Sequence, residues 1–415
     1  MMVKIRTTPE EFLVEEQPPP PGLITEDDTK LPFAVFELTK TGWETQALLS
    51  VISKKIGIPV SSWGISGLKD KRSVTSQLIT IPRNYAPKNK VHGNGWTMTP
   101  FGGAERPLKS GDHRGNRFTI TVRDIIHRDV QLLPSRIAQV KSVGIPNWFD
   151  SQRFGSASGG FLPGQMLISG DLEGAMRLHL TSPQPSDRSS RRRDKKKLRL
   201  LWSNLDELEL ESIQYKPFKE ILRAWKDKSN TPHEAMMAAY YAVPRSLRGL
   251  WISAWQSEIW NGVLRDIILS SYPDHLLRCI EIGVGGPLLY PRAPVGRRGR
   301  AKRSLIENIA QTLNTIPQVL EMPTLDETRM GHMHPSMQER ITSIRREGHQ
   351  MVKSLGIKMS NHERNTVVFP TDLKTSEPIL DDLNGSSKHK RWKCTLSFDL
   401  PSGSYATNVV KRLFQ

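Results

Sequence analysis

The sequence has 415 residues, which is long enough for two domains with a sizeable hydrophobic core. It holds 59 Lys and Arg residues against 42 Asp and Glu residues, so its formal net charge is +17. This excess favours a polyanionic partner, most simply RNA or DNA. A membrane surface is the other candidate, but the sequence has no long apolar run, signal peptide or lipidation motif.

Metal, disulfide and nucleotide chemistry are not indicated. The two cysteines, Cys279 and Cys394, lie far apart and give neither a metal spacing nor a disulfide framework, so a reducing, cytoplasmic environment is expected. His332 and His334 lie two residues apart, but no further ligand stands at metal-site spacing, so a surface or packing role is expected. There is no P-loop and no dinucleotide fingerprint.

The N-terminal region predicts two strands and a helix. Pro9 marks a turn into a strand that contains Phe12, and residues 17–22 form a Pro-rich linker or edge loop. Residues 32–40 (PFAVFELTK) predict a second strand. Apolar residues recur at roughly helical spacing in residues 45–58, and Thr45 is the predicted N-cap.

Residues 66–77 (SGLKDKRSVTSQ) place one acid, Asp70, between Lys69 and Lys71, with Arg72 next. A turn precedes this basic loop, and a strand is predicted from residue 74 to residue 81. A lone carboxylate here is either a salt-bridged structural acid or a nucleophile or base that works beside a polyanion. The local pattern alone favours the structural interpretation.

A further strand is predicted at residues 115–122 (GNRFTITV), after a loop or hairpin over residues 85–114. Asn116 stands at the head of this strand, and Phe118 is on its apolar face. Taken alone, Asn116 is more simply a turn residue and Phe118 a core aromatic. A helix is then predicted over residues 130–143.

The loop that follows (IPNWFDSQRFGS) combines aromatic side chains with Asn147, Gln152 and Arg153. Aromatic rings beside amide and guanidinium groups suit unstacked bases and phosphates. A packed loop with an internally bonded arginine explains the same spacing equally well.

The amino-acid composition of the chain changes after Gly155. Residues 191–199 (RRRDKKKLR) and 297–303 are basic runs, which are usually solvated, mobile segments and here would also add phosphate affinity. Residues 247–269 predict the clearest helix, with Trp251, Trp255 and Trp260 as core residues. The C-terminal part predicts a helix at residues 339–353, strands at residues 366–370 and 391–400, and a final helix after the turn PSGSYAT.

Several of these motifs together resemble the TruD family of tRNA pseudouridine synthases. They are GLKDKRSVTSQ, GNRF, GIPNWFDSQRFG and FDLPSGSYAT, in this order, with PEEFLVEE near the N-terminus and SAWQSEIWN in the long helix. The matches span nearly the whole chain, although the middle and its basic runs carry little of the similarity.

The resemblance implies an intramolecular isomerase that converts a uridine in tRNA, mainly at position 13, to pseudouridine without a cofactor or metal. It implies no obligatory protein partner. The implied fold is α+β, a mixed and largely antiparallel sheet with helices, interrupted by an inserted TRUD domain. We expect the catalytic domain at residues 1–157 and 358–415 and the insertion at residues 158–357.

The resemblance also implies roles for single residues. Asp70 matches the essential acid of the family's G-x-K-D motif, and Lys69 the lysine beside it. Asn116 and Phe118 match the N-x-F pair of the uracil pocket, and Tyr405 matches an aromatic in the C-terminal turn. Arg6 stands where the family often has a lysine, with Lys4 two residues earlier, so either side chain is a candidate for the active site. The candidate RNA contacts are Arg72, Asn147, Gln152 and Arg153.

One alternative has a different functional class. A non-catalytic RNA-binding or RNA-chaperone protein on the same fold would also carry the charge of +17 and the basic runs. Every motif acid and amide is present, which argues against an inactive relative. Product formation on tRNA separates the two hypotheses.

Overall fold

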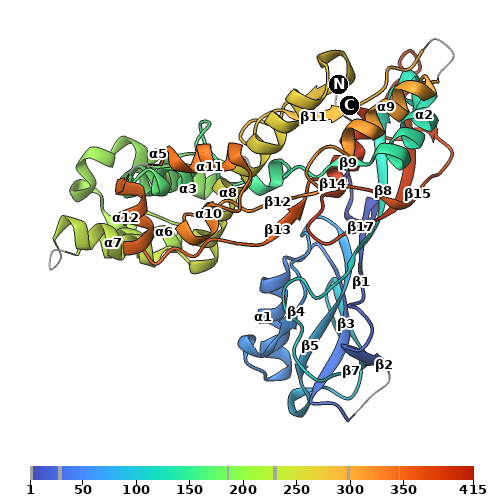
Figure 1. The fold of residues 1–415 in the computed structure, drawn as a ribbon. Helices are drawn as coiled ribbons and strands as arrows, with labels where there is room; N and C mark the ends of the chain where they lie inside the picture. Colours follow the sequence, from blue (N-terminus) through green and yellow to red (C-terminus); the bar gives the residue numbers. More distant parts are fainter. Residues whose placement is uncertain (1–2, 27–29, 185–186, 228–230, 297–299, 345) are drawn as a thin grey trace. The chain divides into compact units, whose positions relative to one another are not determined.

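The structure is a computed structural model that describes residues 3–26, 30–184, 187–227, 231–296, 300–344 and 346–415. The chain forms two compact units (Figure 1). The first unit comprises Met1–Asn147, Arg292–Leu313 and Val367–Gln415, and the second unit comprises Trp148–Pro291 and Asn314–Thr366.

The first unit is built on one large sheet with the strand order β15-β17-β8-β1-β5-β3-β7-β2. Among these neighbours β1 and β5 run parallel and the other pairs are antiparallel, which confirms the predicted α+β class. The strands on this path are β1 (Phe12–Gln17), β2 (Ile24–Glu26), β3 (Phe33–Thr41), β5 (Val74–Pro82), β7 (Trp96–Ala104), β8 (Gly115–Ile125), β15 (Thr371–Thr375) and β17 (Trp392–Pro401). Shorter strands pair with members of this path: β4 (Gly64–Ile65) with β5, β6 (Val91–Gly93) with β7, and β16 (Ile379–Leu380) with β17. A separate two-stranded sheet is formed by β9 (Ile145–Pro146) and β14 (Val367–Val368).

Helix α1 (Thr45–Ile56) connects β3 to the Asp70 loop. Its N-cap is Glu44, so the prediction of Thr45 is wrong by one residue: the Glu44 carboxylate accepts hydrogen bonds from the amides of Gln46 and Ala47. The helix ends at Gly57, whose φ of 76° is left-handed and suits a residue without a Cβ. Its apolar side, Leu48, Leu49 and Ile52, is buried against β3, β5 and β7.

A second core lies where β8 and β17 pair. Phe118, Ile120 and Val122 of β8 are buried with apolar residues of α2 (His127–Val143) and α13 (Ala406–Phe414). Helix α9 (Arg303–Leu313) contacts α2. The predicted strands at β1, β3, β5, β8 and β17 are therefore confirmed. The predicted loop or hairpin over residues 85–114 contains a hairpin of β6 with the long strand β7.

The second unit is mainly helical. Its longest helix, α8 (Arg245–Ser271), contains Trp251, Trp255 and Trp260, and all three are buried, which confirms their core role. The other helices are α3 (Pro163–Ile168), α4 (Leu172–Thr181), α5 (Ser189–Leu200), α6 (Lys216–Trp225), α7 (Pro232–Ala242), α10 (Glu327–Met330), α11 (Pro335–Thr342) and α12 (Arg346–Ser354). Two small ladders are formed by β10 (Leu277–Ile280) with β11 (Leu288–Pro291) and by β12 (Val319–Glu321) with β13 (Glu363–Asn365).

The first basic run, residues 191–199, lies in helix α5 and is not an irregular segment. Lys195 is buried against Asp187, with 2.8 Å between its Nζ and the carboxylate. Asp194 is buried too, and it accepts hydrogen bonds from the amides of Gln214 and Tyr215. The second run, residues 297–303, lies partly outside the described residues. The single helix predicted over residues 339–353 is wrong, because α11 ends at Thr342 and α12 begins at Arg346.

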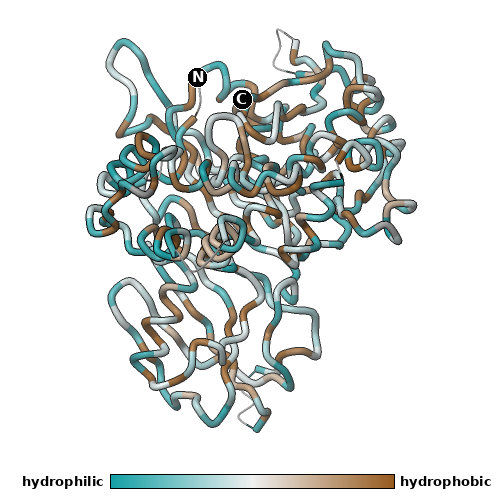
Figure 2. Tube along the Cα trace, turned by 90° about the vertical axis from the view of Figure 1, so that its left-hand side faces the viewer, coloured by the Kyte–Doolittle hydropathy of each residue, from teal (hydrophilic) through white to brown (hydrophobic). Residues whose placement is uncertain are grey.

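Apolar and hydrophilic residues are interspersed along the whole trace (Figure 2). Among the described residues, no helix combines the length and the apolar character needed to cross a membrane.

Candidate active site

The loop that carries Asp70 is fixed to the end of β3 and the start of α1. Thr45 at the first turn of α1 exchanges two hydrogen bonds with the backbone of Lys69, at 3.1 and 3.3 Å. Ser73 bonds the Asp70 carbonyl at 3.0 Å, and the Gln77 amide bonds the Gly67 carbonyl at 3.2 Å. The loop backbone is therefore held by neighbouring elements at several points.

The Asp70 carboxylate lies against Arg6. Arg6 Nη2 donates a hydrogen bond to Asp70 Oδ2 at 2.5 Å, and the side chains are 22% and 27% exposed, so solvent or substrate reaches both. Lys4, the other candidate, instead pairs with Asp124 and Asn384. The guanidinium of Arg6 also stacks over the ring of Phe12, with 4.0 Å to its centroid.

Arg6 has an unusual backbone. Its φ of 61° lies in the left-handed region, which non-glycine residues seldom adopt and which commonly occurs at functional sites. In this conformation the Arg6 side chain reaches both the Asp70 carboxylate and the ring of Phe12.

Lys69 is held by a buried acid. Its Nζ lies 2.5 Å from Glu16 Oε2, and the side chains of Lys69 and Glu16 are 6% and 0% exposed. Burial raises the pKa of Glu16, while the charge of Lys69 and the Leu78 amide act in the opposite direction. Sequence reasoning did not find Glu16, because an acid at the end of a strand has many surface uses.

We predict that Glu16→Gln lowers the free energy of unfolding by about 3 kcal/mol, since it leaves the Lys69 ammonium buried without its partner charge. Urea denaturation of the purified variant measures the change. The matched control is the double variant Glu16→Gln with Lys69→Met, which removes both charges and should recover most of the loss. Equal stability of Glu16→Gln and the wild type would show that the pair contributes nothing.

Lys40 is a second residue that the sequence analysis missed. It is 1% exposed, and its Nζ donates to three carbonyls: Trp43 at 2.8 Å, Lys69 at 3.3 Å and Asp70 at 3.0 Å. Burial lowers the pKa of Lys40 to about 8, although the charges of Asp70 and Glu44 act to raise it. Lys40 therefore places a buried ammonium within hydrogen-bonding distance of the Asp70 carbonyl.

His113 lies beside Gly67, in the neighbourhood of Lys69. A Cβ added to Gly67 would stand 3.4 Å from the His113 ring and 3.6 Å from Lys69 Nζ, so both side chains approach this glycine. Burial and the charge of Lys69 lower the pKa of His113 to about 4, so its ring is neutral at pH 7. No motif pointed to this residue.

The residues expected at a uracil pocket lie at, or close to, the first residues of β8. Asn116 is registered with Glu16 of β1 and Leu400 of β17, so it stands beside the acid that holds Lys69. The ring of Phe118 packs between Phe12 and Phe398, at centroid distances of 6.3 and 5.7 Å.

Tyr405 immediately precedes α13. Strand β17 ends at Pro401, opposite Gly115, so the turn that carries Tyr405 begins beside the head of β8. Phe118, by contrast, is 7% exposed and belongs to the apolar core, so little of its ring faces solvent.

Unpaired polar atoms mark the same region. Among the described residues, Arg6 Nε, Asn116 Oδ1 and Ser404 Oγ are buried without a hydrogen-bond partner. Leaving such a group unpaired costs about 1–3 kcal/mol, so a ligand that pairs with it binds favourably.

The expected RNA contacts fall in both units. Arg72 is exposed on the Asp70 loop. Asn147 is buried, and it is the last residue of the segment Met1–Asn147 of the first unit. Gln152 and Arg153 lie in the second unit, on the 3₁₀ helix Ser151–Phe154, and Arg153 stacks over Phe149 at 5.3 Å. In the described part of the chain, no group of three or more His, Cys, Asp or Glu side chains is placed to hold a metal ion.

The first unit thus defines an α+β protein in which a partly exposed carboxylate sits in a basic site, between a sheet and the start of a helix. The comparisons with known proteins name the family. Residues 1–277 match the model of the family tRNA pseudouridine synthase D (TruD), and the chain belongs to this family. It is accordingly an isomerase of the tRNA pseudouridine synthase class.

Relatives agree over nearly full length. The chain is 28% identical to a protein of Methanococcus maripaludis named probable tRNA pseudouridine synthase D 1, over 92% of this chain and 93% of that one. It is 27% identical to a tRNA pseudouridine synthase D of Leptospira interrogans, over 100% and 96% of the two chains. A crystal structure of a Methanosarcina mazei protein assigned to TruD matches with a TM-score of 0.57 at 20% identity, over 100% of this chain and 93% of that one, and shows the fold.

Proposed function

We propose that this chain converts uridine at position 13 of tRNA to pseudouridine, with Asp70 as the catalytic nucleophile or base. The observation that carries the proposal is the Asp70 carboxylate, which is partly exposed, oriented by Arg6 and located on a loop whose backbone is held by Lys40 and Thr45. A reacting carboxylate needs this combination of access and fixed geometry.

The reaction needs no co-substrate, because uridine and pseudouridine contain the same atoms. The N1–C1′ glycosidic bond breaks, the uracil turns, and a C5–C1′ bond forms; C5 then loses its proton and N1 gains one. Asp70 acts on the ribose or the uracil ring, by attack at C1′ or C6 or by proton abstraction that leads to a glycal. The ribose C1′ is reached only if the uridine leaves the stack and enters the site.

The uracil would be recognised at the head of β8. Asn116 Oδ1 is a buried acceptor without a partner, and the N3–H of uracil supplies the missing donor. Tyr405 supplies an aromatic face on the adjoining turn, and Phe118 supports the pocket from the core. Lys69, beside Asp70, remains tied to Glu16 and fixes the loop.

We further propose that residues 158–357 form the inserted TRUD domain, between catalytic segments at residues 1–157 and 358–415. The helical second unit, Trp148–Pro291 with Asn314–Thr366, supports an insertion of this kind. RNA contacts would come from Arg72, Asn147, Gln152 and Arg153. The tRNA substrate and the free cysteines Cys279 and Cys394 favour a cytoplasmic location.

The test is a pseudouridine map of unmodified tRNA transcripts incubated with the purified chain alone. We expect one new pseudouridine, at position 13, and none in a transcript with cytidine at that position. Product in the absence of other proteins supports the absence of an obligatory partner. Tight tRNA binding without product on any transcript would instead favour a non-catalytic RNA-binding protein.

A further inference from the structure

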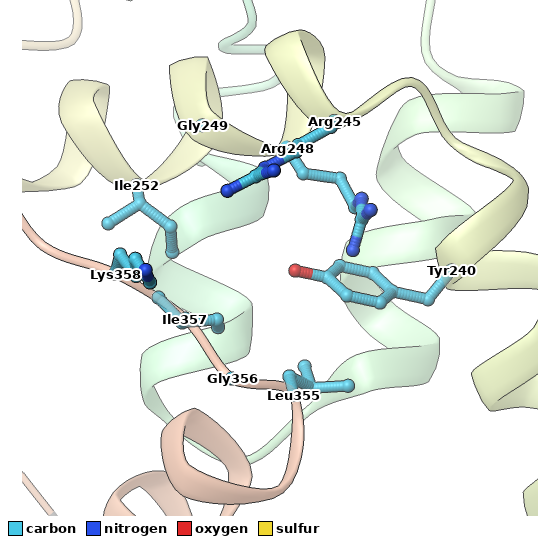
Figure 3. A pocket seen from close by; sticks show the side chains of 9 residues that line it. All are labelled: Tyr240, Arg245, Arg248, Gly249, Ile252, Leu355, Gly356, Ile357 and Lys358. Carbon is cyan, nitrogen blue, oxygen red and sulfur yellow. The ribbon is translucent and has the colours of Figure 1, made fainter.

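The second unit contains a small basic pocket that the proposed chemistry does not use (Figure 3). Its volume is about 140 Å³, and it is lined by the end of α7, the first two turns of α8 and the segment that follows α12. Pockets for drug-sized ligands measure about 300–1,000 Å³. This pocket therefore has room for one small chemical group and not for a whole nucleotide.

The pocket is lined by three cationic side chains, Arg245 and Arg248 from α8 and Lys358 from the segment after α12. Within the part of the chain that the structure describes, none of the three forms an ion pair with a carboxylate. Cations that converge on one cavity without an acid to neutralise them create a local positive potential. The expected ligand is therefore an anion.

Arg248 is oriented in advance. Its Nε donates to the Val243 carbonyl at 3.1 Å, and its guanidinium lies 4.8 Å from the ring of Tyr240 and 5.0 Å from that of Tyr241. Figure 3 shows this guanidinium above the Tyr240 ring, whose hydroxyl points into the cavity. A fixed guanidinium loses less conformational freedom when it binds a phosphate than a mobile one does.

Backbone features add to this potential. Helix α8 is 27 residues long, and its first turn has no acidic residue and no side-chain cap. The positive end of its dipole is therefore not compensated locally. Gly249 and Gly356 also line the pocket, and a Cβ added at either would meet no protein atom within 4 Å, so the cavity is open beside both glycines.

We propose that this pocket binds a phosphate group of the RNA backbone. The inference rests on the proposed function only for the identity of that RNA as tRNA. Two arginines and a lysine around a cavity of this size match a compact anion, and arginine forks fit phosphate oxygens in particular. A sugar–phosphate backbone presents such groups in a row, so an open pocket takes one of them without enclosing the chain.

Gly249→Asp tests the pocket directly, because it places a carboxylate in the open space with a helical backbone unchanged. We expect it to weaken tRNA binding about tenfold in a filter-binding or anisotropy assay. Gly249→Ala is the steric control. Gly331→Asp is the charge control, since Gly331 is an exposed glycine of the same unit with open space around it and outside this pocket. Both controls should bind tRNA within about twofold of the wild type, as surface changes usually have small effects.

A second variant removes cations. The double substitution Arg245→Ala with Lys358→Ala should make the slope of log affinity against log salt less negative by about 0.9. This change corresponds to the loss of one phosphate contact. Thermal melts of each variant establish that it is folded.

Binding of inorganic phosphate, measured beside tRNA binding, distinguishes a pocket for a free anion from a pocket for an RNA phosphate. Loss of inorganic phosphate binding in Gly249→Asp, with tRNA affinity equal to that of Gly249→Ala, would overturn the inference. So would an unchanged salt slope in the double variant. Weaker tRNA binding by Gly249→Asp than by both controls supports the pocket even if the wild type makes no pseudouridine, a result that would remove only the proposed function.

Discussion

Asp70→Asn is expected to leave the chain folded and able to bind tRNA, while pseudouridine formation falls by about 10²–10⁴-fold or more. The amide keeps the size of the carboxylate and one oxygen toward Arg6, so the loop retains its bonds to Lys40, Thr45 and Ser73. It removes the negative charge that a nucleophile or base requires. Single-turnover assays on a tRNA transcript measure the rate, and filter binding measures affinity.

The matched control is Asp112→Asn. Asp112 also pairs with an arginine, at 2.8 and 3.0 Å from Arg106, and its side chain is partly buried. This variant removes the carboxylate charge of an arginine–carboxylate pair near the loop without touching the proposed reacting group, so we expect near wild-type turnover. If Asp70→Asn retained full activity, or if Asp112→Asn lost as much, the role of Asp70 would have to be given up.

The fold was predictable where local pattern and burial agree. Alternating or continuous apolar residues defined β1, β3, β5, β8 and β17, and the long helix α8 was readable from its apolar residues and its tryptophans. The helical form of the basic run in α5 was not predictable from composition, because composition does not reveal that Lys195 is buried against Asp187 or that Asp194 accepts hydrogen bonds from the amides of Gln214 and Tyr215. Which charges of such a run are buried against a partner is decided by tertiary packing.

The candidate site, too, was predictable from the sequence only in part. Asp70, Lys69, Asn116 and Tyr405 stand in family motifs, so the sequence alone predicts a role for each. The sequence does not single out Lys40 and Glu16, because a lysine at the end of one strand and an acid at the end of another are usually ordinary surface residues. Both become distinctive only when the fold buries them against the Asp70 loop.

Lys40→Met is expected to lower turnover by about 10²-fold, with little change in KM. The lost ammonium bonds the Lys69 and Asp70 carbonyls, and a displacement of the loop by about 1 Å misplaces the carboxylate by enough for such a loss. The effect on stability should be small, within about 1–2 kcal/mol. The carbonyls lose a donor, which is unfavourable, but a costly buried charge is also removed, and these contributions oppose each other.

The pH dependence separates this positioning role from a merely structural one. Because burial lowers the pKa of Lys40 to about 8 from 10.5, the wild type should lose turnover as pH rises through about 8, and Lys40→Met should lack that alkaline limb. Between about pH 8 and pH 10.5 the unfolded chain holds more protons on Lys40 than the folded chain does. The contribution of Lys40 to the wild-type free energy of unfolding therefore increases as pH rises from about 8 to 10.5. The groups whose charges act on Lys40 are Asp70, Glu44 and Lys69. A full alkaline limb in Lys40→Met would assign that limb to another group, and unchanged turnover at pH 7 would show that the ammonium does not position Asp70.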